Sequence, residues 1–171
     1  MFALLEELMV RGSDKPQCED GYFVREDEDM ACFAVFDGAT AMDDDLKLMQ
    51  LHGRQLMGGA WVVNVLCRFF QSVEDTIGWD AITDARTALR LADDELLRAF
   101  DEHYPGYPAW RRPAAAAFIV VIRGTKLTWA QVADCIGAVE LNGARGSRWA
   151  FADDQPLREL DTSTYKRMRE L

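Results

Sequence analysis

The sequence contains no apolar run that approaches the ~20 residues needed for a membrane-spanning helix. Its first ten residues, Met1–Val10, carry two glutamates and no basic residue, so they lack the charged start of a secretory signal. These two absences exclude a helical membrane protein and favour a protein that stays in the cytoplasm.

Cysteine and histidine, the residues of structural zinc sites and disulfides, are also scarce. The chain has four cysteines and two histidines, and no two cysteines are spaced as CxxC. This spacing argues against the usual structural zinc sites and against a disulfide framework. Scattered single cysteines are typical of reduced thiols in a cytosolic protein.

Basic residues are fewer than acidic residues. Nineteen lysines and arginines stand against 29 aspartates and glutamates, which gives a formal net charge of −10. A chain this acidic repels phosphate backbones and anionic lipids, so we expect neither a nucleic-acid partner nor a membrane partner. The same charge would suit a cation if the acids are concentrated at one place.

What remains is an ordinary globular composition. The 171 residues are 49% hydrophobic and 28% charged, which predicts one folded domain over residues 1–171. Short apolar runs predict strands, and apolar residues at three- and four-residue steps predict helices. The predicted strands are 22–24, 31–36, 115–123, 127–133 and 136–141, and the predicted helices are 54–74 and 80–102.

Two terminal segments complete this outline. Residues 2–10 predict a strand or a short helix, of which we favour the strand, and residues 165–171 predict helical turns. Residues 22–36 predict an antiparallel hairpin with an acidic tip. Strands, then two helices, then a strand meander indicate an α+β layered domain rather than a doubly wound parallel sheet.

The most informative segment is Val35-Phe-Asp-Gly-Ala-Thr40. A buried strand ends there in Asp37, and Gly38 lets the backbone approach a ligand closely. A carboxylate at the end of a core strand is a common ligand of divalent cations, which prefer oxygen. The alternative is that Asp-Gly is only a turn.

A second acidic pair, Glu19-Asp20, precedes the first strand of the predicted hairpin. Antiparallel pairing brings this pair to the same end of the hairpin as Asp37. Carboxylates gathered at one sheet end repel each other unless they share a cation. Lys15, in the same loop, could then reach an anion held by that metal; the alternative is an ordinary solvated lysine.

These residues resemble the metal-dependent serine/threonine phosphatases of type 2C. The resemblance rests on Lys15-Pro-Gln-Cys-Glu-Asp-Gly-Tyr-Phe23, on Ala34-Val-Phe-Asp-Gly-Ala-Thr40 and on Gln131-Val-Ala-Asp-Cys135. It is closest to bacterial members with Asp-Gly-Ala-Thr in place of Asp-Gly-His-Gly. It covers nearly all of this chain and the N-terminal two-thirds of a typical family domain, which implies a truncated domain.

The resemblance implies an α-β-β-α sandwich of two antiparallel sheets flanked by helices. It also implies a centre of two Mg²⁺ or Mn²⁺ ions whose bridging water attacks a phosphoserine or phosphothreonine of a protein substrate. By position, Glu19, Asp20, Asp37 and Gly38 would form the metal site, with Asp20 in a supporting role. Lys15 would bind the phosphate, and Asp134 would lie near a further metal.

The chain departs from the family pattern at several points. Ala39 stands where a histidine often protonates the leaving group, and Ala133 stands where a glycine precedes the aspartate. No acid after Asp134 is followed by Gly or Asn, so the family's two C-terminal metal aspartates have no counterpart. The alternative is therefore a catalytically inactive domain of phosphatase-like shape that binds or regulates a partner.

Three further features bear on packing and association. A sheet that lacks strands exposes edges, which predicts self-association through one of them. Gly58-Gly59 inside the predicted helix indicates close packing against the sheet, or a helix that begins later. Trp110-Arg-Arg112 is a small basic spot, a type that more often forms local salt bridges than a binding patch.

Overall fold

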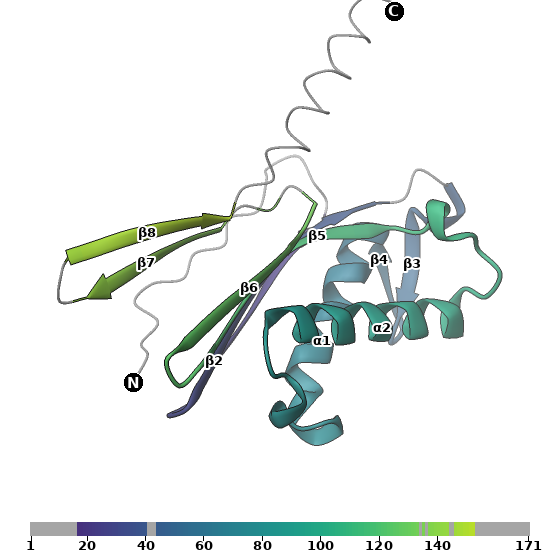
Figure 1. Ribbon diagram of the computed structural model, residues 1–171. Coiled ribbons are helices and arrows are strands. Elements are labelled where there is room, and N and C mark those ends of the chain that lie inside the picture. Colours follow the sequence, from purple (N-terminus) through teal and green to yellow (C-terminus); the bar gives the residue numbers. More distant parts are fainter. Residues whose placement is uncertain (1–16, 41–43, 134, 136, 144–145, 153–171) are drawn as a thin grey trace, which may run out of the picture.

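The computed structural model describes residues 17–40, 44–133, 135, 137–143 and 146–152 (Figure 1). Eight strands, two long helices and three short 3₁₀ helices make up this part of the chain. In chain order they are β1 (Asp20–Glu26), β2 (Met30–Ala39), η1 (Asp44–Leu46), β3 (Leu48–Leu51), β4 (Arg54–Met57), α1 (Gly58–Thr76), η2 (Trp79–Ala81), α2 (Ala85–His103), η3 (Ala109–Arg111), β5 (Ala114–Arg123), β6 (Lys126–Val132), β7 (Gly137–Gly143) and β8 (Gly146–Ala152).

The main sheet is antiparallel and has the strand order β1-β2-β5-β6. β3 pairs with β4, and β7 pairs with β8, each as a two-stranded sheet. The hairpin predicted over residues 22–36 is confirmed as β1–β2, with the turn around Asp27–Asp29. The predicted α+β class, with antiparallel sheets and two helices, is also confirmed.

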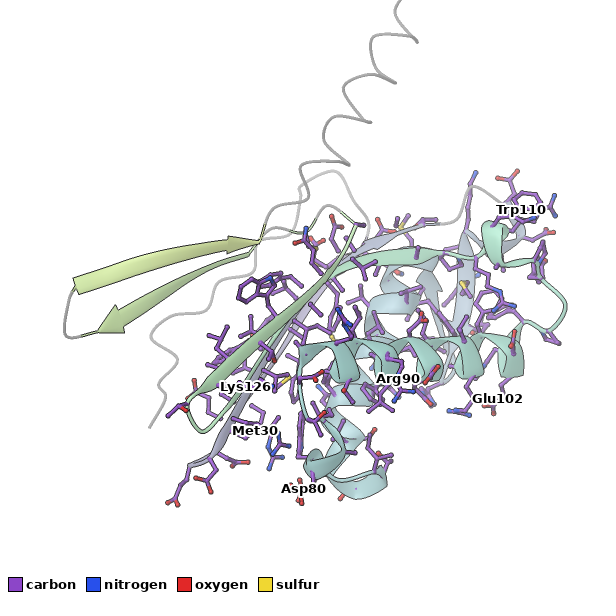
Figure 2. The ribbon with its side chains drawn as sticks, viewed as in Figure 1. Met30, Asp80, Arg90, Glu102, Trp110 and Lys126 are labelled. Carbon is purple, nitrogen blue, oxygen red and sulfur yellow. The ribbon has the colours of Figure 1, made fainter. Side chains whose placement is uncertain are left out.

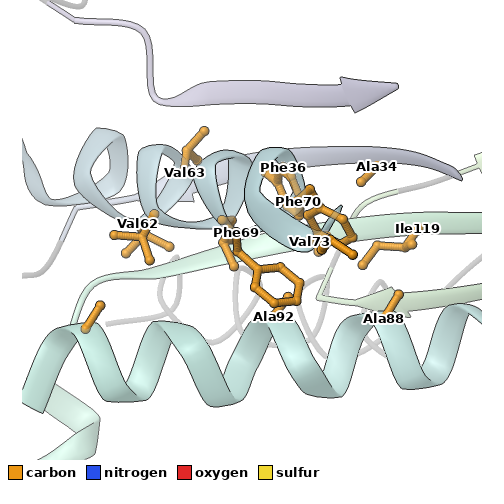
Figure 3. Packing of buried hydrophobic residues seen from close by; sticks show 14 of the residues in the cluster. Ala34, Phe36, Val62, Val63, Phe69, Phe70, Val73, Ala88, Ala92 and Ile119 are labelled. Carbon is orange, nitrogen blue, oxygen red and sulfur yellow. The ribbon is translucent and has the colours of Figure 1, made fainter. Parts of the chain in front are cut away.

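Both long helices cover the same face of the main sheet (Figure 1). The core between them is built from small and apolar side chains of alternate strand positions, such as Ala34, Phe36 and Ile119, which meet Phe70 of α1 and Ala92 of α2 (Figure 3). Trp61 is fully buried, and its indole N–H donates to the carbonyl of Gln50 at 3.0 Å. The side chains at these alternate strand positions therefore form the sheet face that packs against the helices.

The opposite face of the sheet is also largely apolar. Phe33 and Val35 of β2 lie on it, as do Phe118 of β5 and Trp129 of β6, because each alternates with a residue that faces the helices. Val35 is 46% exposed and Trp129 is 47% exposed. A sheet that is apolar on both faces is the type from which layered sandwiches are built.

The structure corrects the start of the first predicted helix. Residues 54–57 form strand β4, and α1 begins at Gly58, so the interpretation of a later helix start is right. The β3–β4 hairpin was not predicted, although His52 and Gly53 at its turn have φ angles of 48° and 77°. Strand β8 was not predicted either.

The second helix is also shorter than predicted at its start. Residues 79–81 are a 3₁₀ turn, and α2 begins at Ala85 behind Asp84, whose side chain accepts the Thr87 amide at 2.8 Å. The strand predicted over 2–10 and the helical turns predicted over 165–171 lie outside the described residues. No helix of the described part is long and apolar enough to cross a membrane.

Candidate functional site

Asp20 and Asp37 are direct neighbours across the β1–β2 pair. The Gly38 amide donates to the Glu19 carbonyl at 2.8 Å, which makes Glu19 and Gly38 a hydrogen-bonded pair. Because the two kinds of pair alternate along antiparallel strands, Asp20 and Asp37 form a non-hydrogen-bonded pair, the kind in which side chains come closest. Their Cβ atoms are therefore expected about 5 Å apart.

Both aspartates are exposed and lie on the sheet face opposite α1 and α2. Phe36 and Gly38, the neighbours of Asp37 in β2, are buried against the helices, so Asp37 points the other way. Two like charges directly opposite each other destabilise a strand pair. A cation placed between them removes that repulsion.

The Glu19 side chain takes a different direction. It is 5% exposed, and its Oε1 atom accepts a hydrogen bond from the Thr40 hydroxyl. The Thr40 oxygen in turn accepts the backbone N–H of Gly59 at 3.2 Å, in the first turn of α1. A carboxylate linked in this way to a helix N-terminus is stabilised by the positive end of the helix dipole.

Gly38 and Gly59 allow β2 and α1 to cross without side chains between them. A Cβ atom on Gly59 would lie 2.8 Å from the carbonyl carbon and oxygen of Gly38, and one on Gly38 would lie 2.7 Å from the Glu19 carbonyl oxygen. Both distances are shorter than packing permits. The close packing predicted for Gly58-Gly59 is therefore present at Gly59, and the Gly38 carbonyl lies against α1.

The structure thus brings together four of the six predicted site residues: Glu19, Asp20, Asp37 and Gly38. Lys15 and Asp134 lie outside the described residues. Asp20 and Asp37 share one face, whereas Glu19 binds the start of α1 on the other. The assignment of metal ligands among these residues stays a prediction.

The oxygen atoms of Asp20 and Asp37 suit a hard divalent cation such as Mg²⁺ or Mn²⁺. Within the described ranges, no three residues among histidine, cysteine, aspartate and glutamate lie close enough to surround an ion. Two carboxylates leave most of an octahedral shell to water, so the donor set fits a weakly held ion.

Sequence reasoning missed the roles of Thr40 and Gly59. In the sequence, Thr40 is only the last residue of the Asp-Gly-Ala-Thr motif, and Gly59 is only one of two neighbouring glycines. The available signal was a hydroxyl residue that ends the motif, together with a helix start whose first amides need an acceptor. A hydroxyl just beyond the motif strand supplies that acceptor.

Neither a family model nor a curated protein matches this sequence. Among solved structures, a serine-threonine phosphatase 2C from Toxoplasma gondii is similar, with a TM-score of 0.45 and 16% sequence identity. The similarity covers 85% of this chain and 49% of that one, so this chain spans about half its length. An overlap this loose carries no conclusion about the activity of the chain.

Proposed function

We propose that this chain is a phosphatase-like domain of type 2C that hydrolyses phosphoserine or phosphothreonine with the help of Mg²⁺ or Mn²⁺. The observation that carries the proposal is the direct opposition of Asp20 and Asp37 at the end of a hairpin. The Asp-Gly-Ala-Thr segment supports it, because it ends the central strand β2 at that place.

In this proposal Asp20 and Asp37 hold the ion through their carboxylate oxygens. The ion, when bound, supplies positive charge that neutralises phosphoryl oxygens and activates water for hydrolysis. In the same proposal Glu19 has a positioning role. Its hydrogen bond from Thr40, which is tied to α1, fixes the end of β2.

The second candidate function is a domain that keeps this shape without catalysis. Ala39 favours it, since it occupies the position next to the carboxylate end of β2 and pairs with Ala114 of β5. Neither side chain can donate a proton to a leaving group. Such a domain would bind a phosphorylated partner without cleaving it.

Phosphate release from a phosphoserine peptide separates the two functions. We expect release in the presence of Mn²⁺, none with chelator, and a loss of at least about a hundredfold in Asp37→Asn. Asp29→Asn is the matched control, because Asp29 lies at the opposite end of the β1–β2 hairpin. Peptide binding without any release in the wild type would support the non-catalytic domain instead.

A further inference from the structure

An apolar cavity lies between α2 and the face of the main sheet that packs against the helices. Its volume is about 420 Å³, which falls within the range of roughly 300–1,000 Å³ that is typical of small-molecule sites. Its walls include the buried side chains of Phe36 in β2, Leu66 in α1 and Ala92 in α2. The cavity is therefore bounded by elements that already form the core.

Small side chains leave this space open. Ala115 and Ala117 of β5 line it together with Leu89, Ala92 and Leu96 of α2. Protein interiors are close-packed and seldom contain a void much larger than a water molecule, so larger residues at these alanines would normally fill it. Water in the cavity would find few polar partners among such side chains. An apolar ligand is therefore the occupant that this lining favours.

The charged residues of the lining all come from α2 and are exposed. They are Arg86, Arg90 and Asp93, of which Arg90 is labelled in Figure 2. Arg90 has a partner in Asp94, at 3.6 Å. The Arg86 side chain, by contrast, makes no hydrogen bond or ion pair within the part of the chain that the structure describes.

The chemistry of this rim selects the charged group of the ligand. A guanidinium without a protein partner binds a carboxylate through two parallel N–H donors, so Arg86 suits an anionic head group. Asp93 at the same rim repels a ligand with several negative charges and so favours a single carboxylate over a phosphate.

We propose that this cavity binds a medium-chain fatty acid. The alkyl chain occupies the apolar space, and the carboxylate pairs with Arg86 at the rim. The site is separate from the acidic end of the hairpin, because Ala117 and Phe36 pair on the helix-facing side of the sheet, whereas Ala116 and Asp37 pair on the other side. Binding in the cavity therefore does not depend on hydrolysis at Asp37.

Isothermal titration calorimetry with hexanoate, octanoate and decanoate, each below its micelle concentration, tests the apolar part of the site. We expect the dissociation constant to fall about fourfold for each added methylene that the cavity buries. Ala115→Leu fills the cavity and should weaken decanoate binding at least about tenfold. Ala114→Leu is the control, because Ala114 is exposed and does not line the cavity.

Arg86→Gln tests the carboxylate contact at an exposed position, where the fold tolerates substitution. We expect it to weaken decanoate about tenfold and to leave decanol, which has the same chain without the charge, unchanged. Arg68→Gln is the control, since Arg68 is an exposed arginine of α1 that does not line the cavity.

Failure of the wild type to bind decanoate, or binding that appears only above the micelle concentration, would overturn the proposal. An affinity that does not change with chain length would overturn it as well. Decanoate binding that is the same in Arg86→Gln and the wild type would contradict the carboxylate contact, even if Ala115→Leu does not fold.

Discussion

Asp20 and Asp37 face each other across two antiparallel strands, in the register position where side chains come closest. The next pair, Glu19 and Gly38, points toward the helices, where Glu19 reaches Thr40 and Gly38 packs on Gly59. The two sides of this hairpin end therefore have separate roles. Its helix-facing side holds the sheet to α1, and its other side gathers negative charge.

The contact between β2 and α1 predicts that Gly38→Ala is strongly destabilising. The new Cβ atom would meet backbone of Glu19 and Gly59, which cannot move aside as a flexible side chain can. We expect the free energy of unfolding to fall by about 3 kcal/mol, measured by urea denaturation. Val35→Ala, on the exposed face of the same strand, is the control and should cost less than about 1 kcal/mol. Equal losses in the two variants would contradict the close packing.

The hydrogen bonds of the Thr40 hydroxyl predict that Thr40→Val and Thr40→Ser differ in stability. Thr40→Val removes the donor to Glu19 and the acceptor of the Gly59 amide, and it leaves a buried carboxylate with one hydrogen bond fewer. We expect a loss of about 2 kcal/mol in Thr40→Val and much less in Thr40→Ser, measured by thermal unfolding. If Val and Ser are tolerated alike, the hydroxyl does not link Glu19 to α1.

The start of α2 predicts a stability term that depends on pH. The hydrogen bond from the Thr87 backbone is the main cause that lowers the pKa of Asp84 below its ordinary value of 3.8. The cap is therefore fully effective above that ordinary value and is lost as the pH falls through the lowered pKa. Asp84→Ala should cost about 1 kcal/mol near neutral pH.

Asp84→Asn serves as the matched variant, because an amide still caps the helix but does not titrate in this range. The stability difference between wild type and Asp84→Ala should shrink in acid, whereas Asp84→Asn should show no such acid-dependent term. An Asp84→Ala deficit that stays constant down to strongly acidic pH would contradict the role of the ionised cap.

The four free thiols are expected to differ in reactivity. Burial raises the pKa of Cys32 to about 12 and that of Cys67 to about 11, so very little thiolate is present at either near neutral pH. Cys32 is buried, whereas Cys18, Cys67 and Cys135 are only half-buried, so a thiol reagent should modify Cys32 last. Mass spectrometry of the modified peptides over time gives the order, with denatured protein as the control. Early labelling of Cys32 in folded protein would contradict its burial.

Much of the fold follows from patterns within single segments. Strand β2 is apolar at nearly every position, and a run of acids precedes it, so the hairpin is readable from the sequence. The start of α1 is not readable in this way. Arg54–Met57 has good helix formers, yet it pairs with β3. Leu56 of this strand packs against the core, and the Gln50 carbonyl of β3 accepts the indole N–H of Trp61.

The candidate site was predictable in place but not in detail. The sequence locates the acids at one hairpin end, since Glu19-Asp20 and Asp37 flank its two strands. It does not determine whether Glu19 or Asp20 lies opposite Asp37, because a shift of one residue in the strand pairing moves each side chain to the other side of the sheet. In the structure, the strand register places Asp20 opposite Asp37. Glu19 is instead linked to α1 through Thr40.

Titration with Mn²⁺, followed by thermal unfolding, tests most directly whether Asp20 and Asp37 form a cation site. The wild type should gain stability as Mn²⁺ is added, since an ion that binds only the folded state shifts unfolding to higher temperature. Asp20→Asn and Asp37→Asn should each lose that gain, while Asp29→Asn keeps it. A gain that persists in Asp20→Asn and Asp37→Asn would contradict the site.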